Sequence, residues 1–136
     1  MSEYADFRAL RETLGFTREN VADACGVSVH SVKRWENPKE SKMPPEDAWN
    51  LLRDAEEDRK MVMEKALSVV ADVGGDAVQL TYWRSQEQYD SLGGGDGFYG
   101  VANANARAVA ECLKDEGVLV EWSYPDDGDN LCREND

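Results

Sequence analysis

The stretch from Arg18 to Asn37 constrains the fold of this chain most, because its spacing predicts two short helices joined by a tight turn. Thr17 and Ser28 are good N-cap residues, one before each helix. Ala22 has the small side chain that lets two helices cross closely, and Gly26 suits a turn with a left-handed backbone. The positions that we expect to be buried where the helices cross are Val21, Cys25, Val27, Val32 and Trp35.

This spacing matches the helix-turn-helix motif position by position. The motif needs a small residue and a glycine at these places because two short helices must pack closely while the second stays exposed for the major groove of DNA. A preceding helix is predicted from Glu3 to Leu14, with Phe7 and Leu10 on its inner face and Gly15 after its end. The exposed helix is predicted from Val29 to Asn37, where Pro38 stops it.

A long helix is predicted next, from Pro44-Pro45 to Gly74-Gly75, spanning about 28 residues. Steps of four and three residues separate the members of one face: Ala48, Leu52, Ala55, Arg59, Val62, Ala66, Val69 and Val73. This pattern fits either a seam between two copies or packing on the same chain, and both interpretations stay open. A break near Glu56 to Asp58 is a further alternative.

The remaining sequence predicts a small α+β part. Strands are expected from Ala77 to Arg84 and from Val118 to Tyr124, with helices from Ser85 to Leu92 and from Tyr99 to Glu116 between them. The chain is therefore expected to be mainly α with a small α+β part. The expected domains are a helix-turn-helix domain at 1–52, a connecting helix at 53–75, a two-strand dimerisation unit at 76–124 and an acidic tail at 125–136.

The segment LRETLGFTRENVADACGVSVHSVKRWENPKESKMP resembles the Cro/repressor-type (XRE) helix-turn-helix family of bacteria and phages, over about residues 5–52. The matching positions are Leu10-Arg11, Leu14-Gly15-Phe16-Thr17, Val21-Ala22, Gly26-Val27-Ser28, Val32 and Trp35-Glu36. The resemblance implies a lambda-repressor-like bundle and a structural ion pair between Arg11 and Glu36. Pro38 stands where the family often has Gly, and the loop to Pro44 is longer than usual.

The same resemblance implies which side chains meet DNA. Val29, His30 and Arg34 would face base edges, with Arg34 placed for a bidentate contact to guanine and Val29 for a thymine methyl. Phosphate contacts are expected from Thr17, Arg18, Ser28, Lys33, Lys39 and Lys42. The segments YWRSQEQYDSL and VANANARAVAECL are similar to the dimerisation part of autorepressors found beside anti-CRISPR genes. Double-stranded DNA and a second copy of the chain are therefore the expected partners.

The charge distribution suggests two parts with different tasks. The chain has a net charge of −13, yet residues 1–45 hold seven basic and seven acidic residues, so the whole excess lies in residues 46–136. We therefore expect weak non-specific affinity for DNA, with base contacts supplying more of the binding. An alternative is a protein-interaction module or antitoxin-like protein whose acidic C-terminal half binds a basic partner protein.

Other classes of protein lack support in the sequence. No apolar run is long enough for a membrane span, and the charged start MSEYADFRALRE does not resemble a signal peptide, so we expect a cytoplasmic protein. The three Cys residues and single His do not suggest a metal site or a disulfide framework. The GGGDG run lacks the Lys-Ser/Thr of a phosphate-binding loop. We expect no cofactor and no enzymatic activity.

Overall fold

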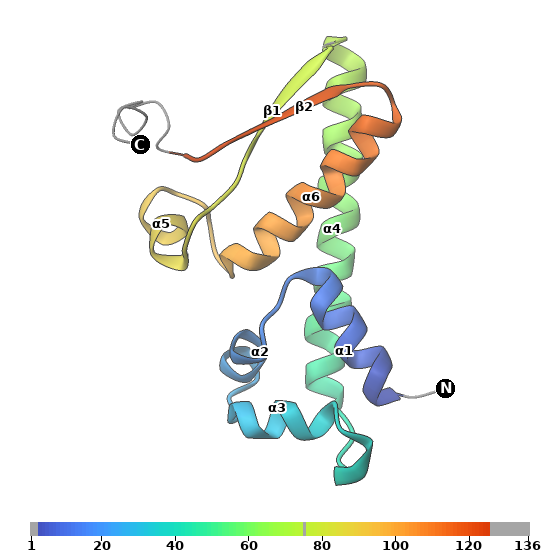
Figure 1. Cartoon of the computed structure of the whole chain (residues 1–136), viewed down its shortest axis with the longest axis vertical. Coiled ribbons are helices and arrows are strands. Elements are labelled where there is room, and N and C mark those ends of the chain that lie inside the picture. Colours follow the sequence, from blue (N-terminus) through green and yellow to red (C-terminus); the bar gives the residue numbers. More distant parts are fainter. Residues whose placement is uncertain (1–2, 75, 126–136) are drawn as a thin grey trace. The chain divides into compact units, whose positions relative to one another are not determined.

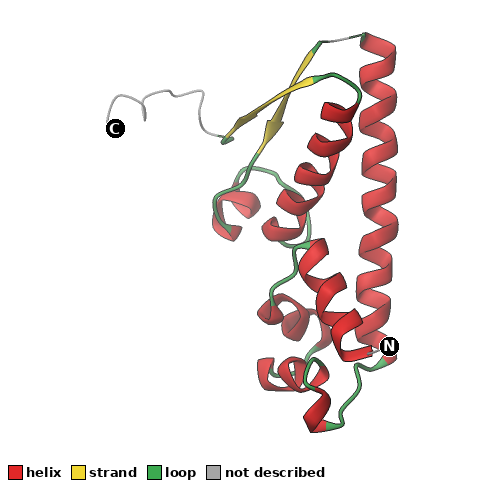
Figure 2. Cartoon of the chain, turned by 45° about the vertical axis from the view of Figure 1, so that its right-hand side comes forward, coloured by secondary structure: helices red, strands yellow, loops and turns green. Residues whose placement is uncertain are grey.

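Helices form most of the chain in the computed structural model, which describes residues 3–74 and 76–125. One two-stranded parallel sheet accompanies them (Figure 2), so the expectation of a mainly α protein with a small α+β part is confirmed. Two compact units divide the chain between Met61 and Val62. The predicted acidic tail lies outside the described residues from residue 126 on. No described helix is both long and apolar enough to cross a membrane.

The N-terminal unit is built from short helices that pack on the first part of a long one (Figure 1). Its elements are α1 (Glu3–Leu14), α2 (Arg18–Cys25), α3 (Val29–Trp35), the short 3-10 helix η1 (Pro38–Glu40) and the start of α4 (Glu46–Val73).

Local capping signals set both ends of α2 and the start of α3 as predicted. The Thr17 side chain accepts a hydrogen bond from the Asn20 backbone, and the Asn20 side chain accepts one from the Thr17 backbone, both at 3.0 Å. Gly26 follows α2 with a φ of 70°, in the left-handed region where a side chain would add strain. Ser28 then caps α3 by accepting from the Ser31 backbone. Gly26 and the Ser28 cap fix the turn between α2 and α3.

The helix α3 ends two residues earlier than the sequence predicts. Its last residue is Trp35, whereas we expected Asn37. Asn37 has an extended backbone because it precedes Pro38, and its side chain accepts a hydrogen bond from the Lys39 backbone at 3.0 Å. Asn37 therefore caps η1 instead of extending α3.

The core of the N-terminal unit lies where α1, α2, α3 and α4 meet. The ring of Phe7 contacts Trp35 and Trp49 edge to face, with centroids 6.0 and 5.2 Å apart. Side chains of Leu14, Val21, Val32 and Leu52 are almost completely buried in the same unit. Burial of this apolar face is what holds α3 in place, with its other face toward solvent.

Val27 contradicts its predicted burial, since 38% of it is exposed. Its backbone N–H donates to the Ala22 carbonyl at 3.0 Å, directly after the left-handed Gly26. This hydrogen bond closes the turn through the backbone and leaves the Val27 side chain in solvent. Leu10 and Cys25 are only half-buried, and burial raises the pKa of the Cys25 thiol.

The long helix α4 runs for 28 residues without the break that Glu56 to Asp58 might have caused. Ala48, Leu52 and Ala55 of the predicted seam are buried within the N-terminal unit, which supports packing on the same chain there. Arg59 donates to the Thr13 carbonyl at 2.9 Å. In the C-terminal unit Ala66 packs against the core. Val62 and Val69 are exposed there, and the side chain of Val73 lies outside the described part.

The C-terminal unit joins two parallel strands through a helical crossover (Figure 1). After the rest of α4 come β1 (Ala77–Thr81), α5 (Gln86–Ser91), α6 (Tyr99–Asp115) and β2 (Leu119–Ser123). The strands pair in register from Ala77 opposite Leu119 to Thr81 opposite Ser123. A crossover is required because parallel strands cannot be joined by a tight turn.

The core of the C-terminal unit lies on one face of this sheet. Val109 and Leu113 of α6 and Val118 before β2 are buried. Partly buried side chains that pack against these three come from α4 and both strands: Met63, Ala66, Val70, Val78, Leu80 and Val120. On the other face Leu119 is 60% exposed.

Two polar contacts fix the crossover. Asn103 of α6 is buried, and its side-chain amide both accepts from the Trp83 N–H and donates to the Trp83 carbonyl, each at 2.8 Å. Tyr89 of α5 donates to the Asp96 carbonyl at 3.1 Å, and Gly94 lies so close to the Tyr89 ring that a Cβ would clash with it. The glycine-rich loop is therefore shaped around a buried tyrosine ring.

Candidate nucleic-acid interface

The predicted base-contacting residues share the solvent-facing side of α3. Val32 and Trp35 are buried and anchor the helix. On the other side His30 is exposed, while Val29 and Arg34 are partly exposed. The structure therefore brings all three predicted base contacts to one accessible helix surface.

The predicted phosphate contacts lie at the starts of α2 and α3, on α3 itself and in the segment that follows it. Thr17, Ser28, Lys33, Lys39 and Lys42 are exposed. Two of them already serve as helix caps, since Thr17 Oγ1 and Ser28 Oγ accept backbone hydrogen bonds at 3.0 and 3.2 Å. A capping hydroxyl keeps its own hydrogen, so it can still donate to an anion.

Arg18 differs from the other predicted phosphate contacts because a buried carboxylate holds it. The side chain of Glu36 is only 2% exposed and accepts from Arg18 Nε at 3.0 Å. The same carboxylate accepts from Arg11 Nε at 2.6 Å and from Arg11 Nη2 at 3.1 Å. Arg11 Nη1 also donates to the Phe16 carbonyl at 2.9 Å. The ion pair implied by the family resemblance is thus present, and Arg18 belongs to it.

The two arginines explain how Glu36 can be buried with its charge. An isolated carboxylate would be costly away from water, but a two-pronged guanidinium contact and a second cation compensate it. Local spacing gave no signal for the Arg18 contact, because the two residues are 18 positions apart and meet only once α2 and α3 cross. The ion pair of Arg18 with Glu36 therefore links α2 to the end of α3.

Arg34 also has an acidic neighbour that the sequence did not indicate. Its Nε lies 3.5 Å from Glu40 Oε1 of η1. The geometry is that of an ion pair without a hydrogen bond, since this Nε is buried and has no hydrogen-bond partner among the described residues. Pro38 and the left-handed Ser41, with a φ of 54°, flank this acid in the loop. Glu40 is six positions after Arg34 in the sequence, and this loop conformation brings its carboxylate to the Arg34 side chain.

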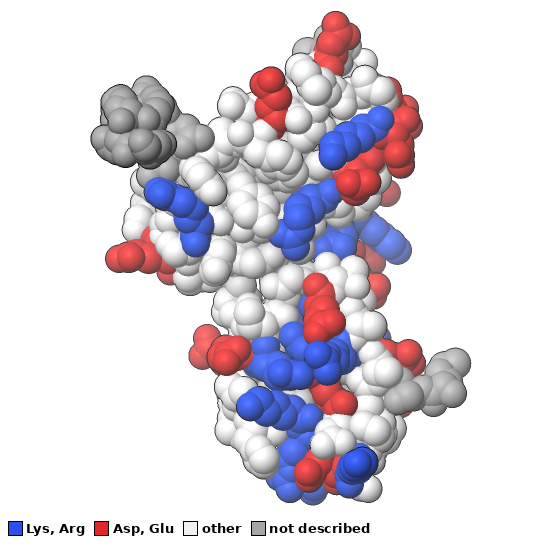
Figure 3. All heavy atoms as spheres, in the orientation of Figure 1, with Lys and Arg blue, Asp and Glu red and all other residues white. Residues whose placement is uncertain are grey.

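The electrostatics of this region favour an anion despite the acidic chain. Residues 28–42 contain four basic and two acidic residues. One of the acids, Glu36, is buried and neutralised by two arginines, and the other, Glu40, is paired with Arg34. Figure 3 shows several Lys and Arg side chains around α3, with Asp and Glu side chains beside them. The solvent-facing charge here is therefore mainly positive.

A scan against protein-family models found no match for this chain, and a search of curated proteins found none either. The geometry of α2, α3 and η1 is therefore the basis for assigning a function.

Proposed function

We propose that this protein is a sequence-specific DNA-binding transcriptional regulator of the Cro/repressor type, which binds as a homodimer. The observation that carries the proposal is the pair α2 and α3. A left-handed Gly26 turns the chain between them, and Val32 and Trp35 anchor α3 from its buried side. The opposite side of α3 then presents Arg34 and its neighbours to a major groove.

In the proposed complex α3 lies in the major groove. Arg34 binds guanine O6 and N7, Val29 contacts a thymine methyl, and His30 contacts a neighbouring base edge. Lys33, Lys39 and Lys42 bind phosphates and set the register of the helix. Glu40 must release Arg34 for this, so the free protein holds its main base-contacting side chain on an acid. The simplest regulatory outcome is repression, because a bound dimer would block polymerase.

A homodimer supports this function because one such helix pair covers one half-site of DNA. The C-terminal unit has surfaces suited to pairing. Leu119 is exposed on β2, and Val62 and Val69 are exposed seven residues apart on α4. A sheet of two strands is also small for independent stability, so extension or cover by a second copy would stabilise it.

The proposal is tested by selecting bound sites from a random DNA library and measuring affinity for the selected site by electrophoretic shift. The change Arg34→Ala is expected to weaken specific binding by about 1–3 kcal/mol in each half-site, about 2–6 kcal/mol for the dimer, because the bidentate contact is lost in both protomers. Arg8→Ala is the matched control, since Arg8 is also an arginine paired with a glutamate, Glu12, but lies on α1. It is expected to leave specific binding unchanged.

A second variant tests the role assigned to the acid in η1. Glu40→Gln keeps the size of the side chain but frees Arg34 from its ionic partner, so we expect tighter binding of the selected site. Thermal unfolding of each variant checks that the fold is intact. A wild-type dimer without sequence preference at low salt would end the regulator proposal. Equal affinities of Arg34→Ala and Arg8→Ala would exclude Arg34 as a base contact.

A further inference from the structure

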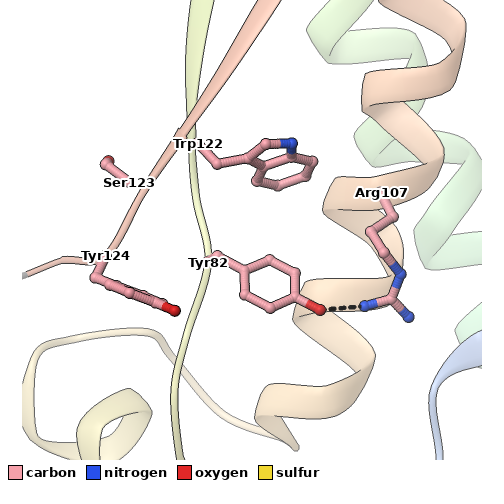
Figure 4. A pocket seen from close by; sticks show the side chains of 5 residues that line it. All are labelled: Tyr82, Arg107, Trp122, Ser123 and Tyr124. Carbon is pink, nitrogen blue, oxygen red and sulfur yellow. Dashed lines mark hydrogen bonds between the residues drawn. The ribbon is translucent and has the colours of Figure 1, made fainter.

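The C-terminal unit contains a pocket of about 460 Å³ that the proposed DNA-binding function does not use. Its lining comes from the end of β2, from the residues that directly follow each strand and from α6 (Figure 4): Tyr82, Arg107, Trp122, Ser123 and Tyr124. The volume is in the range of pockets that bind small molecules.

The pocket lies where the two parallel strands end. Tyr82 directly follows β1, Trp122 and Ser123 are the last residues of β2, and Tyr124 follows them. The carboxyl ends of parallel strands are the usual place for a ligand in open α/β sheets, because the chain leaves the sheet there and its side chains open a crevice. The position of the pocket therefore agrees with its size.

Aromatic rings form most of the pocket surface. The rings of Tyr82 and Trp122 meet edge to face with centroids 5.5 Å apart, so each ring fixes the other. Trp122 and Tyr124 are nevertheless exposed. Two large rings held at the end of a sheet and open to solvent provide a surface for a flat apolar molecule.

The cation in this pocket is positioned by one of these rings. Arg107 Nη1 donates to Tyr82 Oη at 2.7 Å, which orients the guanidinium beside the rings (Figure 4). This is the only hydrogen bond that the described residues make to Arg107, so its other N–H groups remain available. A second arginine, Arg84, lies 5.1 Å from the Tyr124 ring centroid.

The charge of the described lining is positive. The whole chain has 28 acidic and 15 basic residues, yet the five described residues that line the pocket include one arginine and no acid. A local positive charge in an acidic protein favours an anion over a neutral ligand. A guanidinium also matches the geometry of a carboxylate better than that of a single-atom anion.

We propose that this pocket binds a small aromatic carboxylate. Its ring packs against Trp122 and Tyr124, and its carboxylate takes two hydrogen bonds from Arg107. This inference does not depend on DNA binding, since every residue in it belongs to the C-terminal unit.

The experiment uses the full chain and indole-3-acetate as the probe, with binding measured by isothermal titration calorimetry. The uncharged isostere indole-3-acetamide tests the carboxylate, and cyclohexylacetate tests the ring. We expect saturable binding of indole-3-acetate and at least tenfold weaker binding of both analogues. The changes Arg107→Gln and Trp122→Ala are each expected to weaken binding of the probe at least tenfold.

Lys114→Gln is the matched control, because Lys114 is an exposed cation on the same helix that does not line the pocket. It is expected to bind the probe as the wild type does. In ¹⁵N spectra the indole N–H of Trp122 should shift on titration, while that of Trp49 in the N-terminal unit should not.

Three results would overturn the assignment. They are no saturable binding of indole-3-acetate by the wild type, equal affinity of the wild type for indole-3-acetate and indole-3-acetamide, and unchanged affinity of Arg107→Gln for indole-3-acetate. The comparison of indole-3-acetate with indole-3-acetamide uses the wild type, so it remains decisive even if a variant unfolds. Light scattering adds a further criterion. If Trp122→Ala converts a dimer to a monomer and the wild type does not bind the probe, the rings are a contact between copies.

Discussion

At the scale of single residues, the buried carboxylate of Glu36 has the greatest influence on the N-terminal unit. It joins α1, α2 and the end of α3 by accepting from Arg11 and Arg18. Because both the acid and Arg11 are buried, neither can exchange its partner for water.

We therefore expect Glu36→Gln to lower the free energy of unfolding by about 3–5 kcal/mol, because the buried Arg11 charge then keeps only the exposed carboxylate of Glu12, 3.6 Å from its Nη2. The measurement is urea unfolding followed by circular dichroism. Glu46→Gln is the control, since Glu46 pairs with Arg53 in solvent, and it should change the stability little. Similar losses in both variants would contradict the structural role given to Glu36.

The sequence predicted only part of this residue-level picture. The Arg11–Glu36 pair was expected from a family resemblance, whereas the contacts of Arg18 and of Glu40 were not expected at all. Both depend on how distant segments meet: Arg18 reaches Glu36 through the crossing of α2 and α3, and Glu40 reaches Arg34 through a loop. The predicted burial of Val27 was wrong for a related reason. A backbone hydrogen bond closes the turn there, so the Val27 side chain is not needed for it.

At the scale of elements, the bounds that agree with the sequence are those with a local chemical signal. Thr17, Gly26 and Ser28 cap or end helices through bonds to residues no more than four positions away. The pairing of the strands has no such signal. The direction in which β2 lies beside β1 depends on the crossover through α5 and α6, which only the assembled unit defines.

Asn103 is the side chain that ties this crossover to the end of β1. We expect Asn103→Leu to destabilise the C-terminal unit by about 1–3 kcal/mol for each backbone group of Trp83 that loses its partner. Hydrogen exchange measured at the Trp83 amide, together with urea unfolding, checks this expectation.

The control for Asn103→Leu is Asn50→Leu, because Asn50 is an exposed amide on α4. It should leave the exchange rate at Trp83 unchanged. Wild-type protection of the Trp83 amide in Asn103→Leu would show that the amide clamp does not stabilise the crossover.

At the scale of the whole molecule, the net charge of −13 is unevenly distributed along the chain. Residues 1–45 are neutral and residues 46–136 carry the excess. Few cations are therefore available for DNA phosphates, and Arg18 is already bound to Glu36.

With Lys33, Lys39 and Lys42 left in each protomer, a dimer would neutralise about six phosphates, so the logarithm of affinity should fall with the logarithm of salt concentration with a slope of about −5 to −6. Fluorescence anisotropy on the selected site across a series of potassium chloride concentrations measures this slope. Lys42→Gln should make it shallower by about two in the dimer. A wild-type slope steeper than about −10 would mean that further cations contact the DNA.

The parallel pairing of β1 with β2 also sets an order of events during synthesis. The N-terminal unit uses only residues up to Met61, so it can form once the first part of α4 has left the ribosome. Ala77 pairs with Leu119, so the sheet cannot form until the whole crossover has been translated. While the nascent chain grows, Val78 and Leu80 lack their partners on β2, and that interval is when the chain is most exposed to aggregation or to chaperones.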